Sequence, residues 1–312
     1  MFNCYTKYLI KTITSQILYF LGGVYLFKLI NYKRNVFVVC NYHNFSRYHN
    51  YKLKRGSIHE TAYEKNFERQ IRFFKKHFHF IYASEYFDNK VTSGKINFLI
   101  TFDDSYKDNY DLAFPVLKKY NAKAAFFVVT GLIGTGNWLW HDKVHSLVCQ
   151  KKISQSKAYK ILADMNAGIK VPDDFMQFVN TEFRINQEER MVMNWDELSE
   201  MQQAGFEIGS HTDNHTILPF VDDDIQYDEI KESKQKIENH LKHDCISFAY
   251  PNGLYNTVSL KILKENNMKY GYSTIPGFND AHRNKLLIKR VGLNASDSIP
   301  FVLLKLFINQ FK

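Results

Sequence analysis

The chain contains few cysteines, and their spacing shows no metal or redox motif. Four occur among its 312 residues, at Cys4, Cys40, Cys149 and Cys245, with no Cys-x-x-Cys pair. The lack of such a pair argues against a cysteine-ligated zinc site or a thiol redox centre. Scattered cysteines are typical of buried free thiols. They favour a reducing compartment and do not exclude the periplasm.

Internal repeats, low-complexity linkers and a long apolar run are also absent. An uncharged N-terminal stretch holds sixteen residues between Lys11 and Lys28, whereas a spanning helix needs about twenty. Six of its apolar residues share a helical face: Ile13, Ile17, Phe20, Leu21, Val24 and Phe27. An amphipathic helix between lysines suits an anionic membrane surface. Packing on the domain and a signal anchor stay open, and a secretory signal fits poorly because no convincing cleavage site follows.

Basic charge is concentrated at one end of the chain. The formal net charge is +9, and residues 1–60 contribute +8 of it through nine Lys or Arg and one acid, Glu60. The basic residues are Lys7, Lys11, Lys28, Lys33, Arg34, Arg47, Lys52, Lys54 and Arg55. The rest of the chain is nearly neutral, so it lacks the basic stripe of a nucleic-acid-binding protein.

Strand-like and helix-like runs alternate along most of the chain. Strands are expected near 36–42, 97–102, 122–130, 205–210, 245–250, 270–274 and 286–293. Helical periodicity separates most of them, for example at Lys231 to Leu241 and Val258 to Glu265. This alternation predicts a parallel α/β sheet. The stretch of about 138–192 is too long for a strand–helix connection and indicates a helical insertion, which either shapes a substrate groove or is structural padding.

Two adjacent carboxylates end one of the expected strands. The apolar run from Phe98 to Phe102 is followed directly by Asp103 and Asp104. Like charges this close raise each other's pKa, and a bound cation relieves that cost. Adjacent aspartates are also common in turns, so this pair alone does not establish a site.

Two histidines follow another expected strand. His211 and His215 come after the short run 205–209. One carboxylate and two imidazoles make a three-ligand metal set with an open position for water. The other carboxylate is then free to act as a base. A second pair with the same spacing, His141 and His145, is better explained as the start of an amphipathic helix.

Three motifs, in order, resemble those of a known family. TFDDSYKDNY from Thr101, SHTDNHT from Ser210 and SFAYPNG from Ser247 resemble the first three motifs of the polysaccharide deacetylases. This family is the NodB-homology domain of carbohydrate esterase family 4. The likeness covers roughly residues 36–293. It implies a distorted (β/α)7 TIM-like barrel.

Together, these patterns divide the chain into two parts. The basic charge and the helical face of the N-terminus indicate an amphipathic segment over residues 1–34, and the resemblance implies a catalytic domain over residues 35–312 with the insertion inside it. A barrel of this size is a normal single domain.

The resemblance assigns the central roles. It implies that Asp103 is the general base, and that Asp104, His211 and His215 hold one divalent metal. Zinc is the usual ion, with cobalt, nickel or manganese as alternatives. The reaction would be hydrolysis of an N-acetyl group on a sugar, with the metal as Lewis acid.

Further residues are implied to bind or support the substrate. Tyr250 resembles the residue whose backbone N–H helps to bind the carbonyl oxygen, and Pro251 lies beside it. Many members have an Arg where this chain has Ala249, so Asp103 needs other support, for which Arg290 is the candidate. His43, at the end of the first strand, is a further supporting candidate.

Two other departures from the family affect the site. The first motif usually continues with Gly, whereas this chain has Ser105. The last motif usually supplies a His as general acid, and the surroundings of His282 do not match it. The general acid therefore stays unassigned.

The sequence thus predicts a metal-dependent hydrolase that removes the N-acetyl group from an acetamido sugar. The sugar would belong to a cell-envelope polysaccharide or its lipid-linked precursor, with the protein peripheral at the cytoplasmic membrane through residues 1–34 and no nucleic-acid partner. Two alternatives stay open. One is a metal-dependent amidase that acts on a small non-sugar amide. The other is a non-catalytic carbohydrate-binding member of the family, although a binding protein has little need of two adjacent carboxylates beside two histidines.

Overall fold

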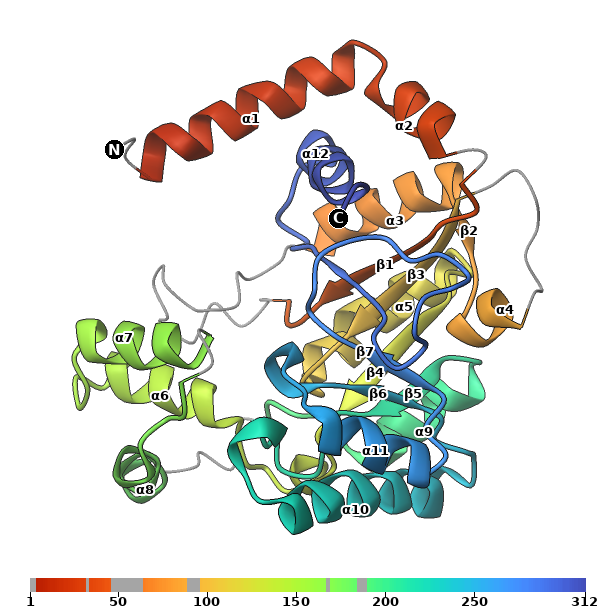
Figure 1. Cartoon of the computed structure of the whole chain (residues 1–312). Helices are drawn as coiled ribbons and strands as arrows, with labels where there is room; N and C mark the ends of the chain where they lie inside the picture. The colour runs from red at the N-terminus through yellow and green to blue at the C-terminus, as the bar shows by residue number, and fades with distance from the viewer. Residues whose placement is uncertain (1–3, 32–33, 46–63, 89–95, 167–168, 184–189) are drawn as a thin grey trace.

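The computed structural model of the chain describes residues 4–31, 34–45, 64–88, 96–166, 169–183 and 190–312. At its centre is a curled, parallel β-sheet surrounded by helices (Figure 1). The strands are β1 (Phe37–Tyr42), β2 (His79–Phe80), β3 (Asn97–Phe102), β4 (Ala124–Val128), β5 (Glu207–Ser210), β6 (Ser247–Ala249), β7 (Tyr270–Tyr272) and β8 (Val291–Gly292). Their order is β7-β6-β5-β4-β3-β1-β8, and β2 pairs with β3.

The sheet curls until one segment contacts both of its edges. Ile288 forms a parallel bridge with Tyr272 at the β7 edge, and Val291 pairs in parallel with Cys40 of β1. The strand expected over 286–293 is therefore realised as this short closing segment. The predicted distorted, barrel-like α/β fold is confirmed.

Burial on both faces explains why the strands are almost continuously apolar. Every residue of β1, β3 and β4 is buried, as expected for parallel strands covered on two sides. Alternate residues enter different clusters, because successive side chains of a strand point to opposite faces. In β1, Val39 packs in one cluster, whereas Val38 and Cys40 pack in the other.

Helices cover the outside of the sheet and its ends. They are α3 (Glu64–His77), α4 (Ala83–Phe87), α5 (Phe114–Lys119), α9 (Trp195–Gln203), α10 (Asp223–Leu241), α11 (Thr257–Glu265) and α12 (Ile299–Asn309). The helices predicted around 231–241 and 258–265 are present as α10 and α11. The two-residue strand β2 was not predicted, because so short a run has no detectable period.

The stretch between β4 and β5 contains a helical unit beside the sheet (Figure 1). Its helices are α6 (Trp140–Cys149), α7 (Gln155–Asn166) and α8 (Asp173–Glu182). They share a small apolar cluster of their own. The unit leaves and rejoins the fold at one point, where Gly134 N–H donates to the Met193 carbonyl oxygen at 3.2 Å. Of the insertion expected over 138–192, residues 167–168 and 184–189 lie outside the described residues.

The N-terminal region forms two helices rather than one. α1 (Cys4–Phe20) and α2 (Gly23–Asn31) meet at a bend of 78°, and α1 packs against α12, which Figure 1 shows nearly end-on. Phe27 is buried against the rings of Phe78, Phe278 and Phe307. The face predicted to be shared by the N-terminal apolar residues is thus divided, with Phe27 turned to the core.

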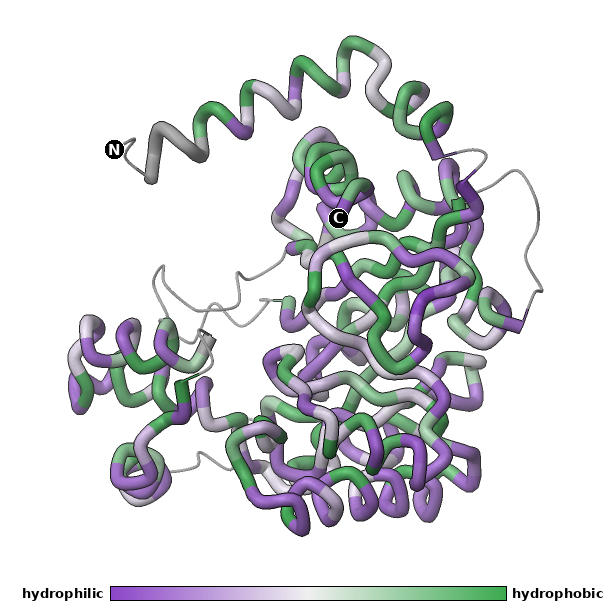
Figure 2. The backbone as a smooth tube through the Cα atoms, in the orientation of Figure 1, coloured by the Kyte–Doolittle hydropathy of each residue, from purple (hydrophilic) through white to green (hydrophobic). Residues whose placement is uncertain are grey.

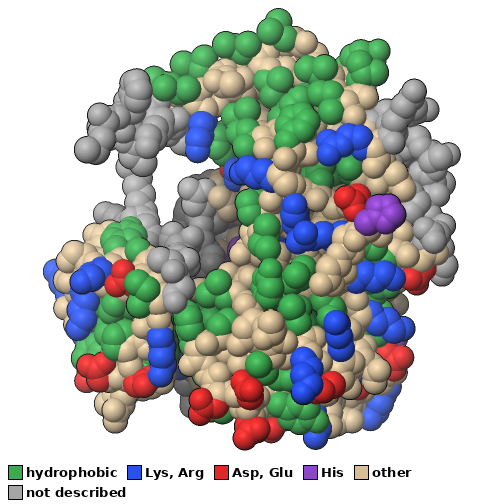
Figure 3. Space-filling model, in the orientation of Figure 1, with side chains coloured by type: hydrophobic (Ala, Val, Ile, Leu, Met, Phe, Trp, Pro, Cys, Tyr) green, Lys and Arg blue, Asp and Glu red, His purple; other side chains and the backbone are tan. Residues whose placement is uncertain are grey.

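The outer side of this helix pair is apolar. In the described part of the chain, no single helix is long and apolar enough to cross a membrane, although the bent pair passes that test by length and composition. Figure 2 shows hydrophobic backbone positions along α1, α2 and α12. Figure 3 shows hydrophobic side chains along this edge, with Lys and Arg side chains spread over the face below it and most acidic ones toward the opposite end.

The cysteine prediction is partly wrong. Cys40 and Cys245 are buried free thiols as predicted, but Cys149 is exposed at the end of α6. An exposed helix terminus needs no apolar side chain, so burial could not be inferred from residue type alone.

Candidate metal centre and active site

The polar residues of the site follow the carboxyl ends of neighbouring strands. Asp103 and Asp104 come directly after β3, His211 follows β5, and Tyr250 follows β6. All four are buried. Parallel barrels bring such residues together at one end of the sheet, and here they line one pocket.

The turn after β3 has an unusual backbone. Asp104 and Ser105 have φ angles of 75° and 63°, a region that non-glycine residues seldom occupy. This backbone conformation explains why the family usually has Gly at the position of Ser105. Ser105 compensates with its side chain, because its hydroxyl accepts a hydrogen bond from Val129 N–H at 2.6 Å. Its carbonyl oxygen accepts another from Met193 N–H.

Asp104, His211 and His215 form a buried cluster with metal-ligand geometry. Their ligand atoms all lie within 4.8 Å of one another. Asp104 Oδ1 is 3.4 Å from His211 Nε2 and 3.2 Å from His215 Nε2. Atoms bound about 2.0–2.1 Å from a tetrahedral ion stand roughly 3.3–3.4 Å apart. The residues therefore fit a single divalent metal held by one carboxylate and two imidazoles.

A hydrogen bond orients the first of these histidines. His211 Nδ1 lies 2.7 Å from the Ala249 carbonyl oxygen, which can only accept. Nδ1 therefore carries the proton, and Nε2 presents its lone pair to the cluster. This is the tautomer that a metal ligand requires.

Glu229 of α10 holds the loop that carries His215. One of its carboxylate oxygens accepts hydrogen bonds from the backbone N–H groups of Asp213 and Asn214, each at 2.9 Å. The other accepts from the Thr216 hydroxyl at 2.7 Å. Glu229 was not predicted as a residue of the site. Its signal was a charged residue on the buried face of an otherwise amphipathic helix.

Asp103 and Arg290 form a buried, bidentate ion pair. Arg290 Nη1 and Nη2 donate to the two carboxylate oxygens, each at 2.7 Å, and Arg290 is only 1% exposed. Its Nε donates to the Ser273 carbonyl oxygen at 2.9 Å. The structure thus places Arg290 where it supports Asp103 in place of the Arg that Ala249 replaces.

The same contacts set the charge of the carboxylates. Burial alone would raise the pKa of Asp103, but Arg290 and then His211 outweigh it and lower that pKa below its usual value. Burial also opposes ionisation of Asp104, yet its contacts with His211 and His215 hold the Asp104 pKa well below its usual range. Both carboxylates are therefore ionised at neutral pH.

Tyr250 makes contacts that differ from those expected of an oxyanion donor. Its backbone N–H donates to the Tyr272 carbonyl oxygen at 3.1 Å as part of the β6–β7 ladder. Its hydroxyl donates to the Leu286 carbonyl oxygen at 2.9 Å. Pro251, the next residue, has no N–H to offer. Tyr250 lines the pocket, but its backbone donor is already used.

His141 was missed as a residue of the site. The helix expected there is present as α6, but its first turn places the ring of His141 5.6 Å from that of His215. Its Nε2 lies 3.0 Å from the Tyr106 hydroxyl, which also donates to Asp142 at 3.0 Å. His43 lines the same pocket. The insertion thus contributes to the pocket wall, which no local pattern could indicate.

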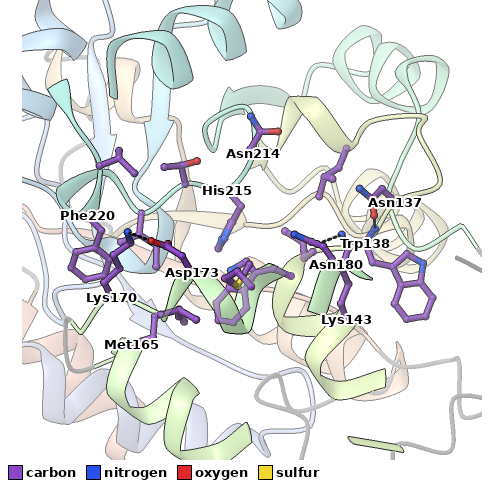
Figure 4. A pocket seen from close by; sticks show the side chains of 18 of the residues that line it. Asn137, Trp138, Lys143, Met165, Lys170, Asp173, Asn180, Asn214, His215 and Phe220 are labelled. Atoms are coloured by element: carbon purple, nitrogen blue, oxygen red, sulfur yellow. Dashed lines mark hydrogen bonds and ion pairs between the residues drawn. The ribbon is translucent and has the colours of Figure 1, made fainter. Parts of the chain in front are cut away.

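A larger cavity adjoins this pocket. The pocket at the metal cluster has a volume of about 70 Å³, whereas the neighbouring cavity has about 780 Å³. Met165 and His215 line both. Figure 4 shows the His215 ring directed into the cavity between Phe220 and Lys170 on one side and Lys143 and Asn180 on the other. The cavity thus lies between the barrel and the insertion.

A barrel that presents a carboxylate and two imidazoles at the carboxyl ends of its strands defines a class of metal-binding hydrolytic enzymes. The model of the family "Polysaccharide deacetylase" matches residues 90–271. The chain belongs to the polysaccharide deacetylase family.

Curated relatives and solved structures agree with this assignment. The putative polysaccharide deacetylase YxkH of Bacillus subtilis is 28% identical over 193 residues, which are 62% of this chain and 50% of the relative. The chain thus spans half the length of that relative. The poly-beta-1,6-N-acetyl-D-glucosamine N-deacetylase of Staphylococcus aureus is 25% identical over 280 residues, covering 84% of this chain and 81% of the relative.

Two solved structures share the fold. The deacetylase PplD of Streptococcus pyogenes, solved with acetate, has a TM-score of 0.63 at 24% identity and covers 87% of this chain and 98% of its own. IcaB of Ammonifex degensii has a TM-score of 0.58 at 20% identity, and the match covers 86% of this chain and 95% of IcaB.

Proposed function

We propose that the chain is a metal-dependent N-deacetylase that hydrolyses the acetamido group of an N-acetylated hexosamine in a polysaccharide. The observation that carries this proposal is the Asp104–His211–His215 cluster with the ionised, Arg290-paired Asp103 facing the same pocket. An amide-hydrolysing site needs an electrophile, a base and a closed pocket. A metal-free binding protein needs none of these.

The roles follow from the geometry. A divalent metal, most simply zinc, would act as a Lewis acid and lower the pKa of water. Asp103 accepts the proton of the attacking water, and Arg290 keeps Asp103 ionised and oriented for that task. Hydrolysis forms a C–O bond, breaks the amide C–N bond and leaves acetate and a sugar amine, which must itself receive a proton.

The two cavities support a substrate longer than one sugar. The catalytic pocket of about 70 Å³ has room for roughly two water molecules at ~30 Å³ each, which suits an acetamido group but not a pyranose ring. The adjoining cavity of about 780 Å³ lies within the range of ligand sites. Its aromatic and amide side chains suit sugar rings and hydroxyls. The Staphylococcus aureus relatives make poly-β-1,6-N-acetylglucosamine the first polymer to test.

Metal content and acetate release test the proposal together. The purified protein is expected to contain about one divalent metal per chain and to release acetate from β-1,6-linked N-acetylglucosamine oligomers. A pentamer should be a better substrate than the monosaccharide, because only the pentamer can fill the larger cavity. Elemental analysis and an enzymatic acetate assay measure both quantities. A protein that binds no zinc, or that hydrolyses small amides while leaving every oligomer intact, would contradict the proposal.

We further propose that the N-terminal segment, residues 1–34, binds an anionic membrane surface beside the catalytic domain, residues 35–312. Phe20 and Leu21 at the bend are 79% and 82% exposed. Along α1, Ser15 is buried while Ile13 and Ile17 are exposed, so the helix presents its apolar side outward. A continuous exposed apolar face of this kind marks an interaction site. Lys11 and Lys28 lie near it in the chain, and their positive charge suits anionic lipid. Arg47, Lys52, Lys54 and Arg55 lie outside the described residues.

Replacing the bend residues tests membrane binding without disturbing the core. The double variant Phe20→Ser/Leu21→Ser is expected to lose at least about ten-fold in affinity for anionic vesicles, because two exposed apolar side chains no longer enter the interface. Vesicle sedimentation measures the change, and acetate release should stay normal. Removal of residues 1–34 is a poorer test, because it also removes the buried Phe27. Unchanged vesicle binding of the double variant would contradict interfacial binding through the bend.

A further inference from the structure

A lysine of the insertion lies on the wall of the larger cavity, close to the catalytic pocket. Trp140 and Lys143 are three residues apart on one face of α6, and both line this cavity. His141, between them in the chain, lines the catalytic pocket. At a rise of 1.5 Å per residue, His141 and Lys143 are only about 3 Å apart along the helix axis. A sugar in the cavity next to the reacting sugar therefore lies near Lys143.

Two contacts hold the Lys143 side chain at this wall. Its Nζ donates a hydrogen bond to Asn180 Oδ1 at 3.1 Å, and Nζ lies 5.8 Å from the centre of the Phe183 ring. Asn180 and Phe183 also line the cavity, and Figure 4 shows Lys143 beside Asn180. Lys143 is half-buried. Burial lowers the pKa of Lys143, and no carboxylate in the described part of the chain opposes that shift.

The other charges around the two cavities are compensated. Lys170 and Asp173 line the larger cavity and form an ion pair with each other at 2.9 Å. In the catalytic pocket, Asp103 is paired with Arg290 at 2.7 Å, and Asp104 faces the two histidines of the metal cluster. The lysine of α6 is thus a cation whose charge is not offset by a neighbouring acid. It repels any further positive charge brought into the cavity.

Deacetylation itself produces such a charge. Hydrolysis of an acetamido group leaves a sugar amine that takes up a proton. An acetylated sugar beside the reacting one is neutral, whereas a sugar that has already been deacetylated brings an ammonium group into the cavity. At a separation of about 6 Å and an effective dielectric constant of about 40–80, the repulsion between two unit charges corresponds to roughly a three- to ten-fold weaker interaction.

We propose that Lys143 is a specificity-determining residue that disfavours a glucosamine unit beside the sugar to be deacetylated. The enzyme then acts faster on sugars with acetylated neighbours than on sugars next to an earlier product. Its product is a polymer in which the free amines are spaced apart. The inference rests on the proposed function, since it needs an N-acetylhexosamine polymer in the cavity.

Two substitutions separate the charge of this residue from its packing. Lys143→Met keeps most of the side-chain length and removes the charge, whereas Lys143→Glu reverses the charge. Lys157 offers a matched control in the same insertion. Its Nζ lies 5.4 Å from the centre of the Phe175 ring, a contact like that of Lys143, but Lys157 lines neither cavity.

The experiment compares kcat/KM for acetate release from two alternating β-1,6-linked pentamers. Both carry N-acetylglucosamine at positions one, three and five. One has glucosamine at positions two and four, and the other has glucose there, which lacks both the acetyl group and the charge. The wild type is expected to use the glucosamine pentamer about three- to ten-fold less well. The two values should become equal in Lys143→Met and reverse in Lys143→Glu, and Lys157→Met should keep the wild-type ratio.

Equilibrium binding gives a second measurement that does not depend on turnover. In an Asp103→Asn background, calorimetric titration should show the same difference of about three- to ten-fold in affinity between the two pentamers, and Lys143→Met should remove it. Equal kcat/KM for both pentamers in the wild type, or a difference that persists in Lys143→Met, would overturn the inference and leave the proposed function intact. A wild-type protein that releases acetate from neither these pentamers nor the fully acetylated one would overturn both.

Discussion

Replacing His215 by Ala is expected to empty the metal centre and to lower kcat/KM by about 10³-fold or more. His215 supplies one of three buried ligand atoms, and two ligands hold a divalent ion far less tightly than three. The metal contributes several kcal/mol of transition-state stabilisation, which corresponds to the expected loss. Elemental analysis should find little metal in the variant, and acetate release should fall to the background rate.

A matched pair of variants makes this test specific. Asp103→Asn should keep its metal, because Asp103 is not part of the ligand cluster, yet lose about 10²–10⁴-fold in rate because the base is gone. His282→Ala removes an exposed His outside the pocket and should change neither quantity. If His215→Ala retained a full metal complement, the assignment of the ligands would be wrong. If Asp103→Asn were fully active, Asp103 would not be the base.

Arg290→Met should both destabilise the fold and move the pH dependence of activity. Arg290 and Asp103 are buried together, and removing one partner leaves the other charge uncompensated. Such changes cost roughly 3–5 kcal/mol of the free energy of unfolding. Urea unfolding measures that loss. The double variant Asp103→Asn/Arg290→Met should recover part of it, because no unpaired charge remains.

The sign of the pH effect follows from the depressed pKa of Asp103. In the wild type this carboxylate contributes stability above its unfolded-state pKa of about 3.9, and the contribution is lost as pH falls through the lower folded-state pKa. Without Arg290, the largest influence that lowers the Asp103 pKa is lost and burial is opposed only by weaker ones such as His211, so this pKa rises. The stability that the ionised carboxylate contributes should then be smaller in the variant, and it should be lost at a higher pH than in the wild type.

The acid limb of kcat/KM in Arg290→Met should move to higher pH for the same reason, because the base must be ionised to act. An acid limb at the wild-type position would show that Arg290 does not control the ionisation of Asp103. Arg290→Lys should fall between the two, since Lys keeps the charge but cannot make the bidentate contact.

The core of the site could be predicted because its signals are local. Asp103, Asp104 and His211 each adjoin the carboxyl end of a strand, and His215 lies four residues further on, so finding the strands also found the residues. Arg290 was a reasonable candidate because a buried carboxylate needs a cation once the usual Arg is replaced by Ala249. The structure brings these residues together within one pocket.

Other residues could not be found this way, because their roles depend on contacts between distant segments. His141 reaches the pocket from the insertion, and Glu229 reaches the His215 loop from α10. Whether the Tyr250 N–H is free depends on its pairing with β7, which no motif reveals. The bend between α1 and α2 was also missed, since Gly22 and its neighbours fit a continuous helical pattern.

The way the insertion joins the barrel bears on how specificity can change in this fold. The two ends of the insertion are joined by a hydrogen bond between Gly134 N–H and the Met193 carbonyl oxygen. The ends can therefore stay together when the length or sequence of the segment between them changes. Doubling the length of such a segment costs only about 0.6 kcal/mol in closure entropy. Met193 N–H in turn donates to the Ser105 carbonyl oxygen, next to Asp104 of the proposed metal centre. A replacement segment would therefore join the barrel at the same point and change the substrate groove, and it would also have to replace the part of the catalytic pocket wall that His141 and Met165 form.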